Sequence, residues 1–327
     1  MEGYKSVLLI VAGLVLFLFA LNALSDSLKQ VTGDKLKKVL DRFTKNLFTG
    51  IISGAVVTIF LDSSSAVIIM TIALVNAGAM TFRQAMGVVM GANIGTTVSS
   101  QIFALDIGEY AAFPIAAGFL LMVTSKNRIY KEVGKIFFSF GLIFFGLFTM
   151  EEAVAPLKDS AYFVSWLQSL ESPWKGMFAG SYVTLVIQSS SATVGMVIGL
   201  ASKGLMTLAA GIAVMLGAEL GTCADTLIAS VGRSRQAIKT GVFHLLFNVC
   251  TIIVGMILLG WFTQLVLWIS GEVSVARKIA NAHMLFNILG VFMVIPFLPL
   301  LERFLNRIMV VIPNRTIDKE KNLEAAA

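Results

Sequence analysis

The chain has 327 residues, of which 57% are hydrophobic and only 13% are charged. Soluble domains carry about a quarter charged residues, so this composition excludes a soluble enzyme or binding domain, and most of the surface must meet lipid. The net charge of +6 does not indicate a nucleic-acid partner, because the basic residues of membrane proteins gather on cytoplasmic loops.

Apolar runs separated by short polar stretches predict an all-α, polytopic membrane protein. The first run, residues 7–24, is long enough to cross a bilayer and lacks the features of a cleaved signal peptide. Residues 25–46 contain six basic residues and apolar residues at helical spacing, which predicts an amphipathic helix on the membrane surface. Further spans are predicted at residues 82–104, 110–123, 133–150, 207–231, 237–259 and 279–301, with a short aromatic-flanked segment at 261–269.

Two other apolar runs are interrupted by the same polar cluster, Asp62-Ser63-Ser64-Ser65 in one and Gln188-Ser189-Ser190-Ser191 in the other. Each cluster is followed by a glycine cluster, Gly91-Ala92-Asn93-Ile94-Gly95-Thr96 or Gly217-Ala218-Glu219-Leu220-Gly221-Thr222. When residues 54–102 are shifted by 126 onto residues 180–228, 19 of the 49 aligned positions are identical. The chain therefore contains an internal repeat.

The repeat divides the chain. Residues 1–150 hold the first copy, together with the span at 133–150 that begins the second. Residues 151–312 hold the remainder of the second copy and the final span, and residues 313–327 form a polar tail that we expect to be disordered.

The basic residues set the topology. If residues 25–46 are cytoplasmic, 19 of the 25 Lys and Arg residues fall inside, with the N-terminus outside and the C-terminus inside. The exceptions are Lys5, Lys158, Lys175, Lys203, Arg277 and Lys278. The interrupted runs then form re-entrant hairpins, residues 47–81 and 174–205, that enter the cell membrane from opposite faces. Such inverted repeats, with broken helices near the midplane, are typical of secondary transporters.

A serine cluster in lipid must satisfy its polar groups, and a helix that stops halfway and turns back achieves this. The returning half-helix begins with amide N–H groups that favour an anion, and serine hydroxyls are hard oxygen ligands that suit Na+. The alternative, close helix packing by small residues, is favoured for a single triplet but not for two at equivalent inverted positions.

The polar residues outside the triplets have two interpretations each. The glycine clusters could be helix contacts, but Asn93 and Glu219 at matching positions favour function, because polar and ionisable residues in spans are costly. His244 and His283 share a local sequence with an Asn four residues later. They could form a proton relay, but we favour hydrogen bonds between packed helices.

With these residues in view, the chain resembles the sodium-dependent phosphate cotransporter family, comprising the type II group and its bacterial relatives. The resemblance rests on the two serine clusters, on the sequence from Gly91 to Thr97 and on the inverted duplication, and it covers roughly residues 7–300. It implies Na+-driven uptake of inorganic phosphate, with both anion and cation bound at the serine triplets. The family usually has Gln where this chain has Asp62 and Asn where it has Glu219.

From the residues and the resemblance, we expect phosphate to bind between the two hairpin tips. The predicted phosphate ligands are Ser63, Ser64, Ser65, Ser189, Ser190, Ser191 and Asn93. The predicted Na+ ligands are Asp62, Gln188, Ser64, Ser190, Asn93, Thr96, Thr97, Glu219 and Thr222. Na+ would act as the coupling ion, and we expect no other cofactor. The sequence does not fix the oligomeric state, and it is compatible with a homodimer.

Three other functions remain open at this point. An intramembrane serine hydrolase would need a serine beside a histidine base, and the chain has no Gly-x-Ser-x-Gly motif. A channel would conduct without saturation or coupling. Among transporters, Na+-coupled uptake of another small anion, such as sulfate or a dicarboxylate, is the alternative to phosphate.

Overall fold

The computed structural model describes residues 2–105 and 107–309, and the predicted polar tail lies outside these ranges. As predicted, the described chain is all-α and has no strand. Its helices are α1 (Glu2–Phe43), α2 (Leu47–Leu61), α3 (Ser64–Asn76), α4 (Phe82–Phe103), α5 (Ala112–Thr124), α6 (Arg128–Val154), α7 (Ala161–Ser169), α8 (Pro173–Ile187), α9 (Ser190–Ser202), α10 (Leu208–Gly221), α11 (Cys223–Ser230), α12 (Arg235–Ile257), α13 (Leu259–Ser270), α14 (Val275–Val294) and α15 (Leu298–Ile308).

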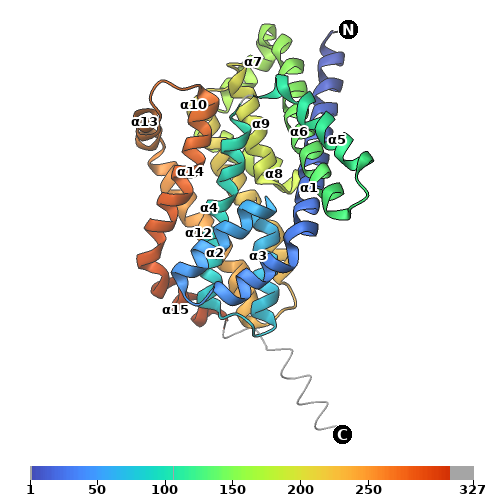
Figure 1. The fold of residues 1–327 in the computed structure, drawn as a ribbon. Coiled ribbons are helices and arrows are strands. Elements are labelled where there is room, and N and C mark those ends of the chain that lie inside the picture. Colours follow the sequence, from blue (N-terminus) through green and yellow to red (C-terminus); the bar gives the residue numbers. More distant parts are fainter. Residues whose placement is uncertain (1, 106, 310–327) are drawn as a thin grey trace.

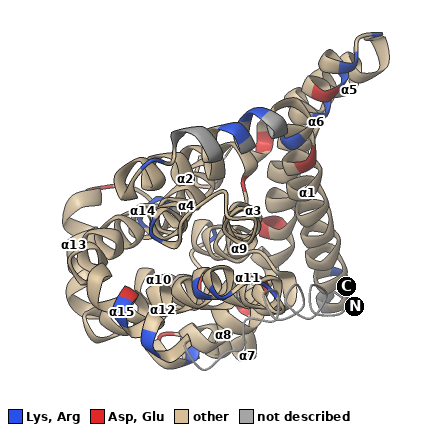
Figure 2. Ribbon diagram, turned by 90° about the horizontal axis from the view of Figure 1, so that it is seen from below, with Lys and Arg blue, Asp and Glu red and all other residues tan. Residues whose placement is uncertain are grey.

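Five helical segments of the described chain are long and apolar enough to cross a membrane, or up to six if one bent pair counts as a span. The five are Tyr4–Thr32, Arg128–Leu157, Leu208–Ser230, Arg235–Ile257 and Val275–Ile308. α4 and α5 qualify only as the bent pair, whereas the sequence predicted two separate spans there. α5 has 13 residues, too few for the roughly 20 that a span needs, and it projects from the bundle together with α6 (Figure 2).

The first helix differs from the prediction. We expected a span at residues 7–24 and a separate surface helix at 25–46, but α1 runs without interruption from Glu2 to Phe43. No proline occurs in this stretch, and proline is the residue that most often breaks a helix interior. The candidate span covers only Tyr4–Thr32, so the lysine-rich end is a continuation of the same helix.

Each serine triplet lies at the turn of a helical hairpin. The first hairpin consists of α2 and α3, and the second of α8 and α9. The chain returns to where the first hairpin began: Gln84 at the start of α4 donates its side-chain N–H to the Thr44 carbonyl, just before α2. α3 lies in the lower half of the bundle and α9 in the upper half (Figure 1), and both lie near its centre when the bundle is seen from below (Figure 2).

The first helix of each hairpin packs tightly on the helix that carries the glycine cluster, α2 on α4 and α8 on α10. A Cβ atom at Gly91 would collide with the carbonyl of Ile51, and one at Gly217 would collide with the carbonyl of Met177. A shift of 126 residues converts the first contact into the second. The glycine clusters are therefore helix contacts, and they fix the level at which each hairpin tip meets its neighbour.

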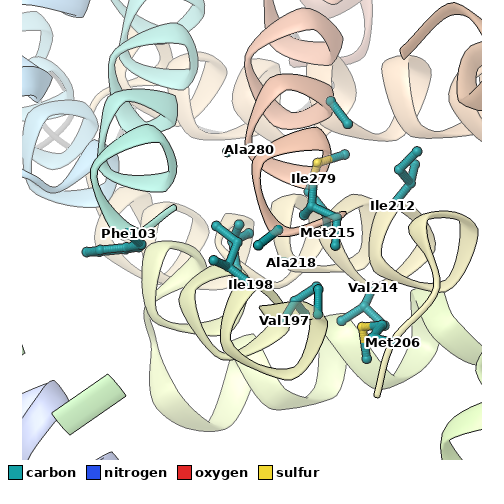
Figure 3. Close-up of a cluster of buried hydrophobic side chains, with 14 of the residues drawn as sticks. Phe103, Val197, Ile198, Met206, Ile212, Val214, Met215, Ala218, Ile279 and Ala280 are labelled. Atoms are coloured by element: carbon teal, nitrogen blue, oxygen red, sulfur yellow. The ribbon is translucent and has the colours of Figure 1, made fainter. Parts of the chain in front are cut away.

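The returning helix of the second hairpin is held by buried side chains on two sides. Val197 and Ile198 of α9 lie beside Met215 of α10 and beside Ile279 and Ala280 of α14 (Figure 3). Lipid is as apolar as these side chains, so close packing rather than removal from water holds α9 in place. This packing fixes the position of the second serine triplet at the start of α9.

Candidate functional site

The two hairpin tips adopt the same backbone conformation. Asp62 (φ 50°, ψ 33°) ends α2, and Gln188 (φ 58°, ψ 31°) ends α8, both in the left-handed region. In the described part of the chain, no other residue except glycine has a positive φ. This conformation costs an L-residue about 1–2 kcal/mol, so its occurrence at both tips identifies the turn as a specified feature of the fold.

The first serine of each triplet caps the returning helix. Ser63 Oγ accepts the N–H of Ala66 at 3.2 Å, and Ser189 Oγ accepts the N–H of Ala192 at 3.1 Å. The second serines, Ser64 and Ser190, are buried in the first helical turn. Each tip therefore presents the N–H groups of a helix start together with serine hydroxyls, which is a favourable arrangement for an anion.

Two hydrogen bonds to carboxylates link the first tip to α4 and to α11. Ser99 of α4 donates its hydroxyl to Asp62 at the first tip. Ser65 of the same tip donates its hydroxyl to Asp225 of α11, with 3.3 Å between the oxygens. Ser99 and Asp225 are equivalent positions, since 99 plus 126 is 225. The carboxylate lies on the hairpin in the first half and on α11, directly after the glycine-cluster helix, in the second.

The glycine contacts have the same register in the two halves. A Cβ at Gly95 would contact Thr58, and one at Gly221 would contact the equivalent Thr184. One helical turn further along, the first pair of helices brings Asp62 to Ser99. The equivalent residues of the second pair are Gln188 and Asp225, and Asp225 contacts the first tip through Ser65.

A buried hydroxyl below the first tip has no partner. Thr58 is 0% exposed, and its Oγ1 makes no hydrogen bond to any described residue. The equivalent Thr184 is satisfied by Thr193, with 2.8 Å between the hydroxyl oxygens. Because unsatisfied buried polar groups are costly, Thr58 Oγ1 is an available oxygen ligand one turn before Asp62.

The predicted threonine ligands lie on the glycine-cluster helices. Thr96, Thr97 and Thr222 are buried, and each hydroxyl donates to a carbonyl of its own helix. Their oxygen lone pairs therefore remain able to accept a hydrogen bond or to coordinate a cation. No hydrogen bond joins these three side chains to either serine triplet in the described residues.

Asn93 and Glu219 reach across to other helices. Asn93 Nδ2 donates to Asn248 Oδ1 of α12 at 2.8 Å. Glu219 Oε1 lies 2.7 Å from His283 Nε2 and accepts from Asn287 Nδ2 at 3.2 Å, both on α14. The structure therefore places these two side chains in contacts between helices, and it shows no hydrogen bond from either of them to a triplet among the residues described.

The histidines also lie between packed helices, as favoured from the sequence. His244 Nε2 accepts from Asn248 Nδ2 at 3.2 Å, and Asn287 Nδ2 donates to the His283 carbonyl at 3.1 Å. Both imidazoles are 0% exposed. Four residues that these histidines and the first tip contact were not predicted from the sequence: Ser99, Ser100, Asp225 and Thr226. The shift of 126 pairs them, and Asp225 is an ionisable residue in a span, which is a signal for function.

Comparisons with known proteins agree with this architecture. A profile of the Na+/Pi-cotransporter family matches residues 16–152 and 160–296, and each segment contains one serine triplet. The uncharacterized protein YqeW of Bacillus subtilis is 28% identical over 306 residues, which is 92% of this chain and 96% of that protein. The putative inorganic phosphate export protein YjbB of Salmonella typhimurium is 22% identical over 322 residues.

That match covers 97% of this chain but only 59% of the length of YjbB. The human sodium-dependent phosphate transport protein 2B is 29% identical over 115 residues, which is 34% of this chain and 17% of that protein. No solved structure gives a significant match. Because the family profile covers most of the chain in two segments, the chain belongs to the Na+/Pi-cotransporter family, a family of membrane transporters rather than enzymes, and this membership supports phosphate transport.

Proposed function

We propose that the protein is a secondary active transporter that couples inward movement of Na+ to uptake of inorganic phosphate. The observation that carries the proposal is the pair of equivalent hairpin tips, each with a left-handed residue followed by a serine-capped helix start. We infer that the tips enter the membrane from opposite faces as an inverted repeat, with the end of the bundle that holds α15 in the cytoplasm.

Phosphate binds between the two tips in this proposal. Its ligands are the hydroxyls of Ser64, Ser65, Ser190 and Ser191 and the free N–H groups of the first turns of α3 and α9. Ser63 and Ser189 already accept a helix N–H, but each hydroxyl hydrogen can still point to the anion. A helix start and neutral donors can hold an oxyanion without a basic residue.

The carboxylates at the tips explain why cations are needed. A negative charge about 4 Å from another costs about 4 kcal/mol at an effective dielectric of about 20, so Asp62 and Asp225 would oppose phosphate binding by themselves. One Na+ at Asp62, Ser99 and Thr58 and a second at Asp225 and Gln188 would remove this repulsion. The hydroxyls of Thr96, Thr97 and Thr222 are further candidate ligands. Asn93 and Glu219 would support the helices rather than bind Na+ directly.

The test is uptake of radiolabelled phosphate into proteoliposomes that contain the purified protein. An inward Na+ gradient should drive saturable uptake, and replacement of Na+ by choline should abolish it. Uptake that is equal in the two buffers would contradict the coupling. Release of preloaded phosphate driven by an outward Na+ gradient would show that the direction of phosphate transport follows the Na+ gradient. This second measurement matters because relatives of the chain are named as phosphate export proteins.

The alternative is Na+-coupled transport of another small anion. Sulfate is also a tetrahedral oxyanion that neutral donors and helix starts can hold, so it is the first anion to compare, followed by a dicarboxylate. Unlabelled phosphate should compete with the labelled ion far better than either of these anions. Equal competition by sulfate would contradict the assignment of phosphate as the preferred substrate.

A further inference from the structure

α12 and α14 carry the same short sequence although the main repeat does not relate them. Phe243-His244-Leu245-Leu246-Phe247-Asn248 in α12 aligns with Ala282-His283-Met284-Leu285-Phe286-Asn287 in α14 after a shift of 39 residues. Both histidines are 0% exposed, and both asparagines are 2% exposed. The two helices therefore present the same buried polar pair to their neighbours.

The histidines contact equivalent positions of the main repeat. His283 Nδ1 lies 2.6 Å from Ser100 Oγ of α4, and His244 Nδ1 lies 2.8 Å from Thr226 Oγ1 of α11. These two hydroxyl residues are related by the shift of 126, since 100 plus 126 is 226. The shift of 39 relates the two histidines, and the shift of 126 relates the two hydroxyl residues that they contact. The two contacts are therefore equivalent, which general helix packing would not produce.

The residue before each hydroxyl contacts a hairpin tip. Ser99 donates to Asp62, and Asp225 accepts from Ser65. Successive residues on a helix point about 100° apart, so one residue faces the tip and the next faces the histidine. The rotation of α4 or α11 that places Ser99 or Asp225 is thus fixed by the contact of the neighbouring residue with a histidine.

The hydrogen-bond directions show how firmly each imidazole is held. His244 Nε2 accepts from the Asn248 amide, so its Nδ1–H donates to Thr226 Oγ1, whose hydroxyl donates to the Cys223 carbonyl at 3.0 Å. His283 Nε2–H donates to Glu219 Oε1, so Nδ1 accepts from Ser100. Both nitrogens of each ring have a hydrogen-bond partner, so the orientation of both imidazoles is fixed.

We propose that His244 and His283 are equivalent positioning residues that connect α12 and α14 to the first hairpin tip. In this arrangement His283 joins α14 to α4 of the first half, and His244 joins α12 to α11 of the second. The histidines touch neither phosphate nor Na+. They act by holding Ser100 and Thr226, and hence Ser99 and Asp225, in place. The effect on Na+ binding rests on the proposed function, whereas the effect on the tip does not.

The experiment uses the full-length protein purified in detergent. Ser100→Ala and Thr226→Val remove the two hydroxyls, whereas Ser100→Thr and Thr226→Ser keep them. Thr251→Val is the matched control, because Thr251 is also buried but donates only to carbonyls of its own helix. The first readout is amide hydrogen exchange of residues 62–66, the first tip, without ligands. The second is the Na+ concentration for half-maximal phosphate binding.

We expect Ser100→Ala and Thr226→Val to speed amide hydrogen exchange at the tip. Both variants should also raise the half-saturating Na+ concentration by about threefold, an effect typical of the loss of one buried hydrogen bond between membrane helices. His283→Gln combined with Ser100→Ala should be no worse than Ser100→Ala alone. Ser100→Thr, Thr226→Ser and Thr251→Val should match the wild type at the tip. If Ser100→Ala and Thr226→Val exchange at the tip as slowly as Thr251→Val does, the proposal is wrong.

The two readouts also separate this proposal from the proposed function. A wild-type protein that binds no phosphate in Na+ would contradict the function, and the exchange measurement would still decide the role of the histidines. A wild type with Na+-dependent binding, together with variants unchanged in both readouts, would contradict only the positioning role.

Discussion

Single residues at the tips decide what this site can hold. Asp62 and Gln188 have a conformation that is unfavourable for both, and backbone strain of this kind persists where the surrounding structure imposes it and often marks a functional site. The strained residue turns the chain so that the next serine caps the returning helix. A polar side chain at the turn and a hydroxyl at the cap therefore arise from one local arrangement, repeated twice.

Removal of the buried serine hydroxyls should weaken phosphate binding. Ser64→Ala or Ser190→Ala should reduce the affinity at least tenfold, because a hydrogen bond to a charged ligand contributes about 1.5–3 kcal/mol. Titration of the purified variants with phosphate in Na+ buffer measures this. Ser202→Ala is a suitable control, because its hydroxyl donates to the Gly199 carbonyl at the far end of α9. Wild-type affinity in both tip variants would place the anion elsewhere.

At the scale of helices, the close contact of α2 with α4 and of α8 with α10 is what positions the tips. The sequence shows these glycine clusters but leaves open whether they pack helices together or bind a ligand. The structure shows that they pack, because a side chain at Gly91 or Gly217 would meet a backbone carbonyl that has no freedom to move. Their polar neighbours Asn93 and Glu219 have a separate role, in contacts with α12 and α14.

Alanine at these glycines should separate the helices. Gly91→Ala and Gly217→Ala should each lower the stability by about 1–3 kcal/mol or more, as overpacking does in a dense interior. Gly260→Ala in α13 is the control, because a Cβ there has open space and alanine favours a helix more than glycine does. Thermal unfolding in detergent measures the difference. Equal melting temperatures for all three variants would contradict the close contact.

At the scale of the whole molecule, much of the fold could be predicted because it is repeated in the sequence. The hairpins, their tips and the glycine helices follow from Ser63–Ser65, Ser189–Ser191 and one shift of 126. The continuity of α1 could not be predicted, because a rise in lysine content indicates a change of environment and not the end of a helix. The contacts of His244 and His283 with Thr226 and Ser100 could not be predicted, because the sequence shared by α12 and α14 does not show which helices the two histidines face.

The candidate site could be predicted only where identical residues recur in the two copies of the repeat. The triplets were found because identical residues recur, whereas Asp225 was missed because the equivalent residue is Ser99, and the comparison of identities ignores that pair. Only the structure shows that the first half has its carboxylate on the hairpin and the second half on the adjacent helix. The two halves are therefore similar in shape but exchange the positions of charge and neutral donor.

This exchange of charge predicts how the net charge of transport depends on Asp62. Asp62→Gln gives the first tip the residue of the second and removes one negative charge from the proposed Na+ site. Na+ affinity should fall, and if the number of Na+ ions is unchanged, one more positive charge should move per cycle. Moving one charge is worth about 2.3 kcal/mol per 100 mV, so uptake should become more voltage-dependent.

The measurement is Na+-dependent phosphate uptake by the wild type and by Asp62→Gln in proteoliposomes, across imposed potentials and across pH. Asp26→Asn is the control, because Asp26 is an exposed carboxylate of α1 whose one ion pair among the described residues is with Lys29, at 3.2 Å. A variant with wild-type Na+ dependence that loses a pH-dependent step would show that Asp62 carries a proton instead of facing Na+. The charge that opposes phosphate at the first tip would then be removed by protonation, and only the site at Asp225 would need a cation.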